Sequence, residues 1–264
     1  MADQLAVTSV ESRADIISAG QVEIPQYSRR SILAIWAAAA LPMGGLAWVV
    51  APLLASGGGD ATLIRALLWC LTAGLIWQFV LVVGLVWFEQ RSLRWSTLRS
   101  VLWLNAPSSP RTGRTGGRVW LVVLPLIAAL AAEELVPSLP HPGARDLGVF
   151  LGSDAGHAMF HGAWDLFALV VVLGIFNTAL GEELLFRGFL LPRMNGAFGR
   201  ADWVANGVLF AAYHLHVPWV IPAGLLDTFI LAYPAKRFRS ALIGIVVHSA
   251  QTVFFTLAVL ALVR

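Results

Sequence analysis

The sequence predicts an all-α fold, a polytopic bundle of about seven transmembrane helices. Of its 264 residues, 58% are hydrophobic and only 12% are charged. Soluble domains average about 25% charged residues, so this chain has too few polar side chains to cover a water-soluble globule. The apolar residues also fall in runs that approach the ~20 residues needed to cross a bilayer as a helix. We therefore expect an integral, multi-pass membrane protein with the lipid bilayer as a partner.

The predicted spans follow one another along the chain after a polar segment, 1–30, that is expected to form a cytosolic tail. The seven apolar runs are predicted at 31–55, 62–88, 119–139, 164–191, 203–216, 219–233 and 240–263. The fifth and sixth runs are short. We expect these two helices to be tilted, broken or partly buried in protein, where irregular backbone is tolerated within a membrane.

The distribution of basic residues predicts the orientation of the bundle. If the spans alternate, one side of the membrane receives the basic residues of the connecting segments, namely Arg29, Arg30, the six arginines of 89–118, Arg193, Arg200, Lys236, Arg237 and Arg239. The positive-inside rule then places the N-terminus in the cytosol, and we expect a bacterial cell membrane. Because these residues set topology, the net charge of +3 indicates no nucleic-acid partner.

Five ionisable residues within the apolar runs are the candidate functional residues, because a charged side chain costs about 2.5–3.5 kcal/mol at the centre of a span. They come from three different spans and are Glu182, Glu183, Arg187, His214 and His248. At 1.5 Å per residue Glu182, His214 and His248 lie at similar depth, roughly 12–17 Å from the cytosolic side. A common depth favours one shared site. The alternative is a buried ion pair that fixes helix register, with histidines that merely bond backbone carbonyls.

The spacing of the acid pair predicts different roles for its two members. On a helix, Glu183 and Arg187 are neighbours at i and i+4 and can form an ion pair. Glu182 lies about 100° further around the helix and is left to face another element. Asp227, in the sixth run, is a further candidate that could pair with a neighbour.

These residues fall in motifs that resemble a known family of membrane enzymes. The segment 181–188, Gly-Glu-Glu-Leu-Leu-Phe-Arg-Gly, matches an EExxxR motif, and 210–214, Phe-Ala-Ala-Tyr-His, matches FxxxH. His248 stands where a third motif, HxxxN, begins. The chain thus resembles the CAAX-protease and bacteriocin-processing (Abi) family of intramembrane endopeptidases, which includes the type II CAAX prenyl endopeptidases. The resemblance covers about 166–255, and it departs at Thr252, which stands in place of the Asn with Gln251 beside it.

The resemblance implies a catalytic core at 140–264 and an N-terminal region at 31–139 that carries the basic cytosolic loop 89–118. It implies peptide hydrolysis in which Glu182 activates a water and His214 helps to hold it. His248, with Thr252 or Gln251, would stabilise the oxyanion, while Glu183 and Arg187 position Glu182. Phe210 would contact the substrate. The implied partners are membrane-anchored, lipidated or leader-peptide substrates, reached by a site that opens toward the cytosol.

Metal dependence stays open from the sequence. Glu182, His214 and His248 could form a zinc site of the His2Glu type, although the chain has no HExxH motif. The family is described both as metalloprotease and as glutamate-type protease, and the second mechanism needs no cofactor. Two functions of other classes also remain, a non-catalytic immunity or scaffold protein of the same fold and a proton-coupled transporter.

Two further groups of polar residues are predicted to be structural. Glu133 and Glu134 form a second acid pair, but Ser138 stands where the motif requires Arg, so a solvated span end is expected. Asp154, His157, His161 and Asp165 would share one face of a continuous helix, where a second metal site is the less favoured interpretation.

Overall fold

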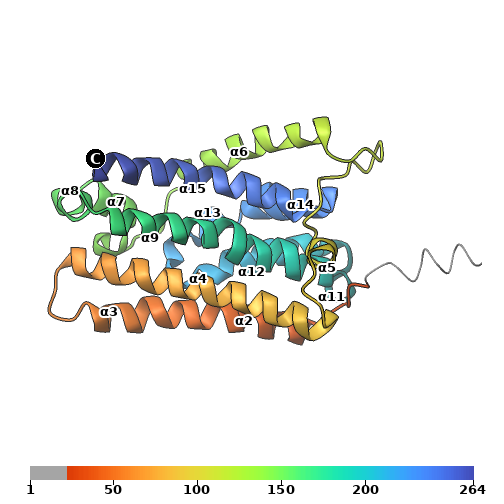
Figure 1. Cartoon of the computed structure of the whole chain (residues 1–264), viewed down its shortest axis with the longest axis horizontal. Coiled ribbons are helices and arrows are strands. Elements are labelled where there is room, and N and C mark those ends of the chain that lie inside the picture. The colour runs from red at the N-terminus through yellow and green to blue at the C-terminus, as the bar shows by residue number, and fades with distance from the viewer. Residues whose placement is uncertain (1–22) are drawn as a thin grey trace, which may run out of the picture.

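A computed structural model describes residues 23–264 as a bundle of helices (Figure 1). Within these residues the only β pairing is an isolated bridge between Ser108 and Thr115, so the predicted all-α class is confirmed. The predicted tail lies outside the described residues up to position 22. Its last part packs against the bundle, and the backbone N–H of Tyr27 donates to the carbonyl of Arg193 over 2.9 Å.

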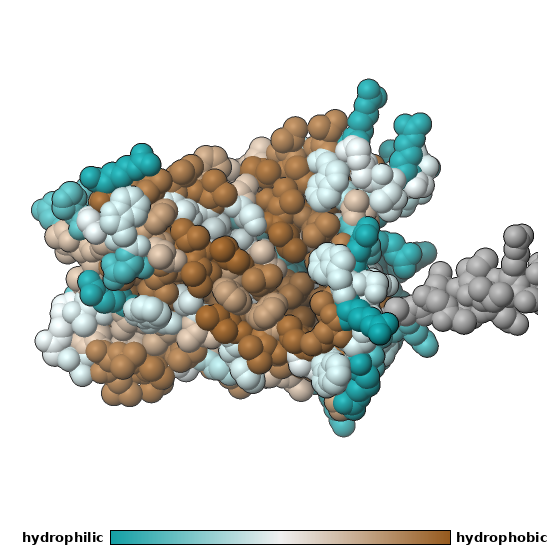
Figure 2. All heavy atoms as spheres, viewed as in Figure 1, coloured by the Kyte–Doolittle hydropathy of each residue, from teal (hydrophilic) through white to brown (hydrophobic). Residues whose placement is uncertain are grey.

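Four helices of the described chain are long and apolar enough to cross a membrane. They are Arg29–Leu54, which joins α2 (Arg29–Gly45), the π-helical η1 (Leu46–Val50) and α3 (Ala51–Leu54); α4 (Asp60–Gln90); Trp164–Arg193; and α15 (Ala241–Val263). Figure 2 shows apolar side chains across the middle of the bundle and hydrophilic ones gathered toward its two ends. Both observations support an integral membrane protein.

The prediction of about seven spans is not confirmed, because the other apolar helices are short. The run at 119–139 forms the 3-10 helix η2 (Gly117–Val122), α6 (Val123–Ala131) and the 3-10 helix η3 (Ala132–Leu135), of which only Gly117–Ala131 is continuous and apolar. The fifth forms α12 (Asp202–Tyr213), and its 12 residues extend only ~18 Å. The sixth is divided between α13 (Ile221–Gly224), the π-helical η10 (Thr228–Ala232) and α14 (Tyr233–Phe238).

Short helices occupy the two ends of the bundle (Figure 1). α5 (Trp95–Val101), α11 (Asn195–Phe198) and the turn η7 (Gly199–Ala201) lie at the end where α2 begins. The turn η4 (Gly143–Arg145), α7 (Leu147–Leu151) and α8 (Asp154–Phe160) lie at the opposite end, where α15 finishes. The turns η8 (His214–His216) and η9 (Pro218–Val220) follow α12.

The long helix Trp164–Arg193 is the central element, and it packs against both α4 and α15. It comprises α9 (Trp164–Ile175), two π-helical stretches, η5 (Phe176–Gly181) and η6 (Leu184–Leu190), and α10 (Leu191–Arg193). A Cβ on Gly181 would lie 3.3 Å from the carbonyl oxygen of Leu75 in α4, so only glycine allows this close approach without displacement. π-Helical turns frequently occur at functional sites, and these two flank the acid pair.

A buried arginine anchors the end of this central helix. Arg193 is fully buried, and its Nη2 lies 2.6 Å from Glu89 Oε2 near the end of α4. Its Nη1 also donates to the carbonyl oxygens of Val101 (3.1 Å) and Phe189 (2.8 Å). This network joins α4, α5 and the central helix at one end of the bundle, and so fixes the axial position of the acid pair.

Candidate active site

The two glutamates of the acid pair lie in different environments, as the sequence predicted. Glu183 is fully buried, and its Oε1 lies 3.1 Å from Nη1 of the fully buried Arg187. The ion pair predicted between positions i and i+4 is therefore confirmed, even though η6 widens the helix between its partners. Glu182 is 2% exposed and contacts other elements of the bundle.

A chain of hydrogen bonds across three helices holds Glu182. The amide of Gln78 in α4 donates to the hydroxyl of Tyr213 at the end of α12, and this hydroxyl is hydrogen-bonded to Glu182. Gln78 and Tyr213 are both fully buried. Sequence reasoning missed these two residues. Gln78 could have been found from the presence of its amide side chain within an apolar run, because a buried polar group requires a hydrogen-bond partner.

His248 of α15 completes the arrangement around Glu183. Its Nδ1 lies 3.2 Å from Glu183 Oε1, the same oxygen that pairs with Arg187. Glu183 thus connects a guanidinium on its own helix with an imidazole on another, and fixes the orientation of that imidazole. The residue is an organising group of the site and not only the partner of Arg187.

Phe210 is a common packing surface for the basic side chains. Its ring centroid lies 3.9 Å from the guanidinium carbon of Arg187, 5.0 Å from the His214 ring and 6.2 Å from the His248 ring. A cation over an aromatic face is attracted by the ring quadrupole, which partly compensates for the burial of Arg187. The aromatic residue of the FxxxH motif therefore supports the site from α12.

The hydrogen bond of His214 determines which ring nitrogen carries hydrogen. Its Nδ1 lies 3.0 Å from the backbone oxygen of Phe210, and a carbonyl can only accept, so Nδ1 is the donor. In the neutral ring Nε2 is then left as an acceptor. His248 differs, because its Nδ1 faces the Glu183 carboxylate. The two imidazoles therefore offer different chemistry at their free nitrogens.

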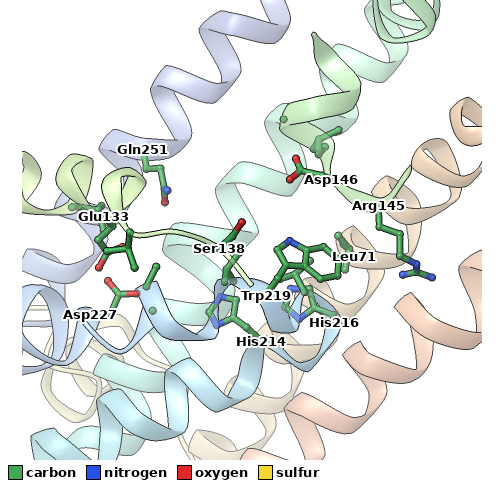
Figure 3. Close-up of a pocket in the computed structure, with 18 of the residues that line it drawn as sticks. Leu71, Glu133, Ser138, Arg145, Asp146, His214, His216, Trp219, Asp227 and Gln251 are labelled. Atoms are coloured by element: carbon green, nitrogen blue, oxygen red, sulfur yellow. The ribbon is translucent and has the colours of Figure 1, made fainter. Parts of the chain in front are cut away.

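A cavity of about 680 Å³ reaches these histidines (Figure 3). Of the predicted site residues, Phe210, His214, His248 and Gln251 line it. The remaining four, Glu182, Glu183, Arg187 and Thr252, do not. The cavity thus exposes the imidazoles directly, whereas the acid pair lies beyond its lining.

The cavity extends toward the end of the bundle that holds η4 and α7 (Figures 1 and 3). Its lining includes the segment 135–138 and the segment 145–148, which belong to the irregular connection after α6. The basic segments at α5 and α11 lie at the opposite end. The lining thus includes residues of the end opposite the basic segments, and the expected opening toward the cytosol stays a prediction.

Gln251 and Thr252 are the two candidates to replace the Asn of the third motif, and they lie in different surroundings. The amide of Gln251 projects into the cavity (Figure 3). The Thr252 methyl packs against α9, where a Cβ on Gly174 would lie 2.5 Å from it. Gln251 is therefore the side chain available to a ligand in the cavity, and Thr252 packs between helices.

Further polar residues line the same cavity, among them Asp227, His216 and Glu133. Asp227 is 6% exposed, and His216 is buried beside His214, with ring centroids 5.5 Å apart. Glu133 also lines the cavity, so it is not simply a solvated span end as predicted. The sequence placed Glu133 and His216 at the ends of helices, and hydropathy alone could not show that the connection after α6 folds over the site.

One side of the cavity lining is held by aromatic stacking. The ring of His141 stacks on that of Trp219, with centroids 4.8 Å apart, and its Nε2 lies 2.7 Å from Asp146 Oδ2. The hydrogen bonds of His141 with the backbone oxygen of Leu139 and with Asp146 raise the pKa of its ring. These contacts attach the connection after α6 to η9.

The predicted metal ligands do not form a ligand set. Among residues 23–264, no group of three or more His, Cys, Asp or Glu side chains is arranged to hold a metal ion. Each of these three side chains is instead hydrogen-bonded within the protein. Glu182 bonds to Tyr213, His214 to the backbone of Phe210, and His248 to Glu183. The helix face predicted to carry Asp154, His157, His161 and Asp165 does not form either. α8 ends at Phe160, and the break in the helix separates His157 from Asp165.

We expect Gly244→Ala to destabilise the protein by about 1–3 kcal/mol, the usual effect of overpacking a close contact. A Cβ at this position of α15 would lie 2.1 Å from Glu183 Oε2, and Glu183 cannot move without weakening its contacts with Arg187 and His248. Thermal unfolding in detergent measures the effect. Gly84→Ala in α4 is the matched control, because its Cβ would meet nothing within 4 Å. Equal unfolding temperatures for the two variants would contradict the prediction.

Comparison with known proteins identifies the segment that carries the site. The family model described as type II CAAX prenyl endopeptidase Rce1-like matches residues 159–254, which confirms the resemblance predicted from the motifs. No curated protein and no solved structure matches the chain. The matched segment contains all five ionisable site residues. The match suggests a CAAX-type intramembrane protease and does not favour the scaffold or transporter alternatives.

Proposed function

We propose that this protein is an intramembrane endopeptidase that hydrolyses peptide bonds of membrane-anchored, lipidated or leader-peptide substrates by a glutamate-activated water. The observation that carries the proposal is a buried carboxyl group, Glu182, held by Tyr213 near two imidazoles of different hydrogen-bond character. Hydrolysis needs a base for the water and a donor for the oxyanion. This arrangement supplies both.

In the proposed mechanism Glu182 is the general base. A water bound between Glu182 and His214 donates one hydrogen to the carboxylate and the other to Nε2 of His214, which accepts because Nδ1 bonds to Phe210. A lone pair of the water oxygen is then free to attack the scissile carbonyl carbon. Glu182 takes the proton as the C–O bond forms and later gives it to the leaving amine. The net change is addition of OH to the carbonyl carbon and of H to the nitrogen.

His248 and Gln251 are the proposed oxyanion donors, because both line the cavity. Glu183 accepts the Nδ1 hydrogen of His248 and balances its charge when Nε2 also carries hydrogen. Nε2 and the amide of Gln251 can then donate to the oxyanion. Arg187 keeps Glu183 in place. The proposed reaction uses the side chains alone, which is supported by the absence, among residues 23–264, of three or more His, Cys, Asp or Glu side chains arranged to hold a metal ion.

The proposal is tested with purified protein in liposomes and synthetic peptides anchored by a farnesylated cysteine. We expect cleavage that continues after treatment with a metal chelator. In ¹⁸O-labelled water, mass spectrometry should find one labelled oxygen in the new carboxyl group. An unlabelled product, or complete loss of activity that returns on adding zinc, would contradict the glutamate-type mechanism. Persistent absence of cleavage across prenylated, acylated and leader peptides would contradict the protease function itself.

A further inference from the structure

The buried site contains three carboxyl groups and a single guanidinium group. Glu182, Glu183 and Asp227 are each at least nine-tenths buried, and the one arginine among them is Arg187. Arg187 pairs with Glu183. Asp227 experiences the charges of Arg187, His248 and Glu183, but within residues 23–264 it makes no ion pair with a cation. An additional positive charge in this region would therefore be favoured.

Asp227 is the acid that faces the cavity with an unused hydrogen-bonding atom. It lines the cavity, is 6% exposed, and its Oδ1 has no hydrogen-bond partner in the described part of the chain. Buried polar atoms without partners are uncommon in folded proteins. A carboxylate oxygen without a partner, on a residue that lines a cavity, is best explained by a donor that arrives with the ligand.

The position of Asp227 is fixed before any ligand arrives. It directly precedes η10, which packs tightly against α12: a Cβ on Gly207 would lie 2.2 Å from Oγ1 of Thr228. A Cβ on Gly224 would lie 4.0 Å from Oδ2 of Asp227 itself. The carboxylate is thus presented on a close-packed helix pair, which suits a binding subsite because little ordering is needed on binding.

The other charged residues of the cavity do not neutralise Asp227. Arg145 lies with its guanidinium carbon 4.0 Å from the Trp48 ring centroid and donates to the backbone of Ala47, on the far side of the cavity (Figure 3). Asp146 pairs with His141. Glu133 adds a second carboxyl group to the lining, on the same side as Asp227 in Figure 3. This side of the cavity is acidic.

We propose that Asp227 forms a specificity subsite for a lysine or arginine side chain of the peptide substrate, beside the histidines that act on the scissile bond. The inference rests on the proposed function and adds the substrate class. A basic side chain supplies hydrogen-bond donors to the Asp227 carboxylate and a positive charge beside it. The (CH₂) stem of the same side chain packs against the apolar part of the cavity.

The test uses peptides anchored by a farnesylated cysteine that carry lysine, norleucine or glutamate at each of the four positions nearest the scissile bond. At one position we expect the lysine peptide to be cleaved with a kcat/KM about tenfold above the norleucine peptide, the effect of one charge-assisted hydrogen bond. Asp227→Asn should remove this preference and Asp227→Glu should keep it. Asp165→Asn is the matched control, because Asp165 is exposed and does not line the cavity.

A binding measurement separates failure of the subsite from failure of the proposed function. The same peptides are bound to the Glu182→Gln variant, and lysine should again be preferred about tenfold. Lysine-selective binding without cleavage by the wild type would support the subsite and contradict the protease function. Cleavage without a lysine preference, or a preference that survives in folded Asp227→Asn protein, would overturn the subsite. Thermal unfolding confirms that each variant is folded.

Discussion

Replacing Glu182 by glutamine is expected to lower kcat for peptide hydrolysis by at least about 100-fold, the typical contribution of a general base. Glutamine has nearly the same volume, and its amide oxygen still accepts from the Tyr213 hydroxyl. The hydrogen bonds that run from Gln78 through Tyr213 to position 182 can therefore persist. The amide cannot take a proton from water. The loss should therefore appear in kcat, measured with peptides anchored by a farnesylated cysteine, while the unfolding temperature stays close to that of the wild type.

The neighbouring Glu183→Gln variant provides the contrast. Its carboxylate is the shared partner of Arg187 and His248, so neutralising it leaves a buried guanidinium without a counter-charge. That variant should lose stability as well as activity. Glu23→Gln, an exposed position, serves as the matched control and should change neither. Wild-type turnover in folded Glu182→Gln protein would contradict the assignment of the base.

The sequence predicted the local parts of the site best. The contact between Glu183 and Arg187 depends only on helical spacing, and it forms in the structure. The contact of His248 with Glu183 joins residues 65 positions apart, and no periodicity specifies it. The same holds for Gln78 and Tyr213, 135 positions apart. Motif matching located these helices but could not orient them against one another.

The choice between Gln251 and Thr252 shows why a motif position is not sufficient. Adjacent residues on a helix point about 100° apart, so the rotation of α15 decides which of them faces the cavity. Close packing at Gly174 sets that rotation and turns Thr252 away. The residue at the family's Asn position thus becomes a packing contact, and the preceding residue becomes available to a ligand.

The predicted number of about seven spans is not confirmed, because hydropathy does not distinguish a helix exposed to lipid from a short helix buried in protein. α12 is apolar, yet it carries Asn206, whose amide donates to the carbonyl of Phe186 over 2.8 Å. Its buried face supplies Phe210, and His214 follows directly at its end, while Val204 and Val208 on another face are exposed. The position of the connection after α6 could not be predicted either, because a segment without hydrophobic periodicity does not indicate that it lines a cavity.

Arg187→Met is expected to destabilise the protein by about 3–5 kcal/mol, the loss seen when one partner of a buried ion pair is removed. Methionine can fill much of the space over Phe210, where the guanidinium carbon lies 3.9 Å from the ring centroid, so the loss of packing is small. The fully buried carboxylate of Glu183, which keeps His248 but loses the guanidinium, dominates the effect. Thermal and denaturant unfolding in detergent measure the change, with Arg111→Met in the exposed basic loop as the control.

The double variant Glu183→Gln with Arg187→Met separates charge from packing. If the unpaired carboxylate is the cause, neutralising it should restore most of the stability that Arg187→Met removes, and the two effects should be strongly non-additive. Activity should remain low in the double variant, because His248 loses the carboxylate that orients its Nδ1. Additive losses would instead show that Arg187 stabilises the fold through contacts other than Glu183, and Asp227, which also experiences its charge, would then be the residue to test.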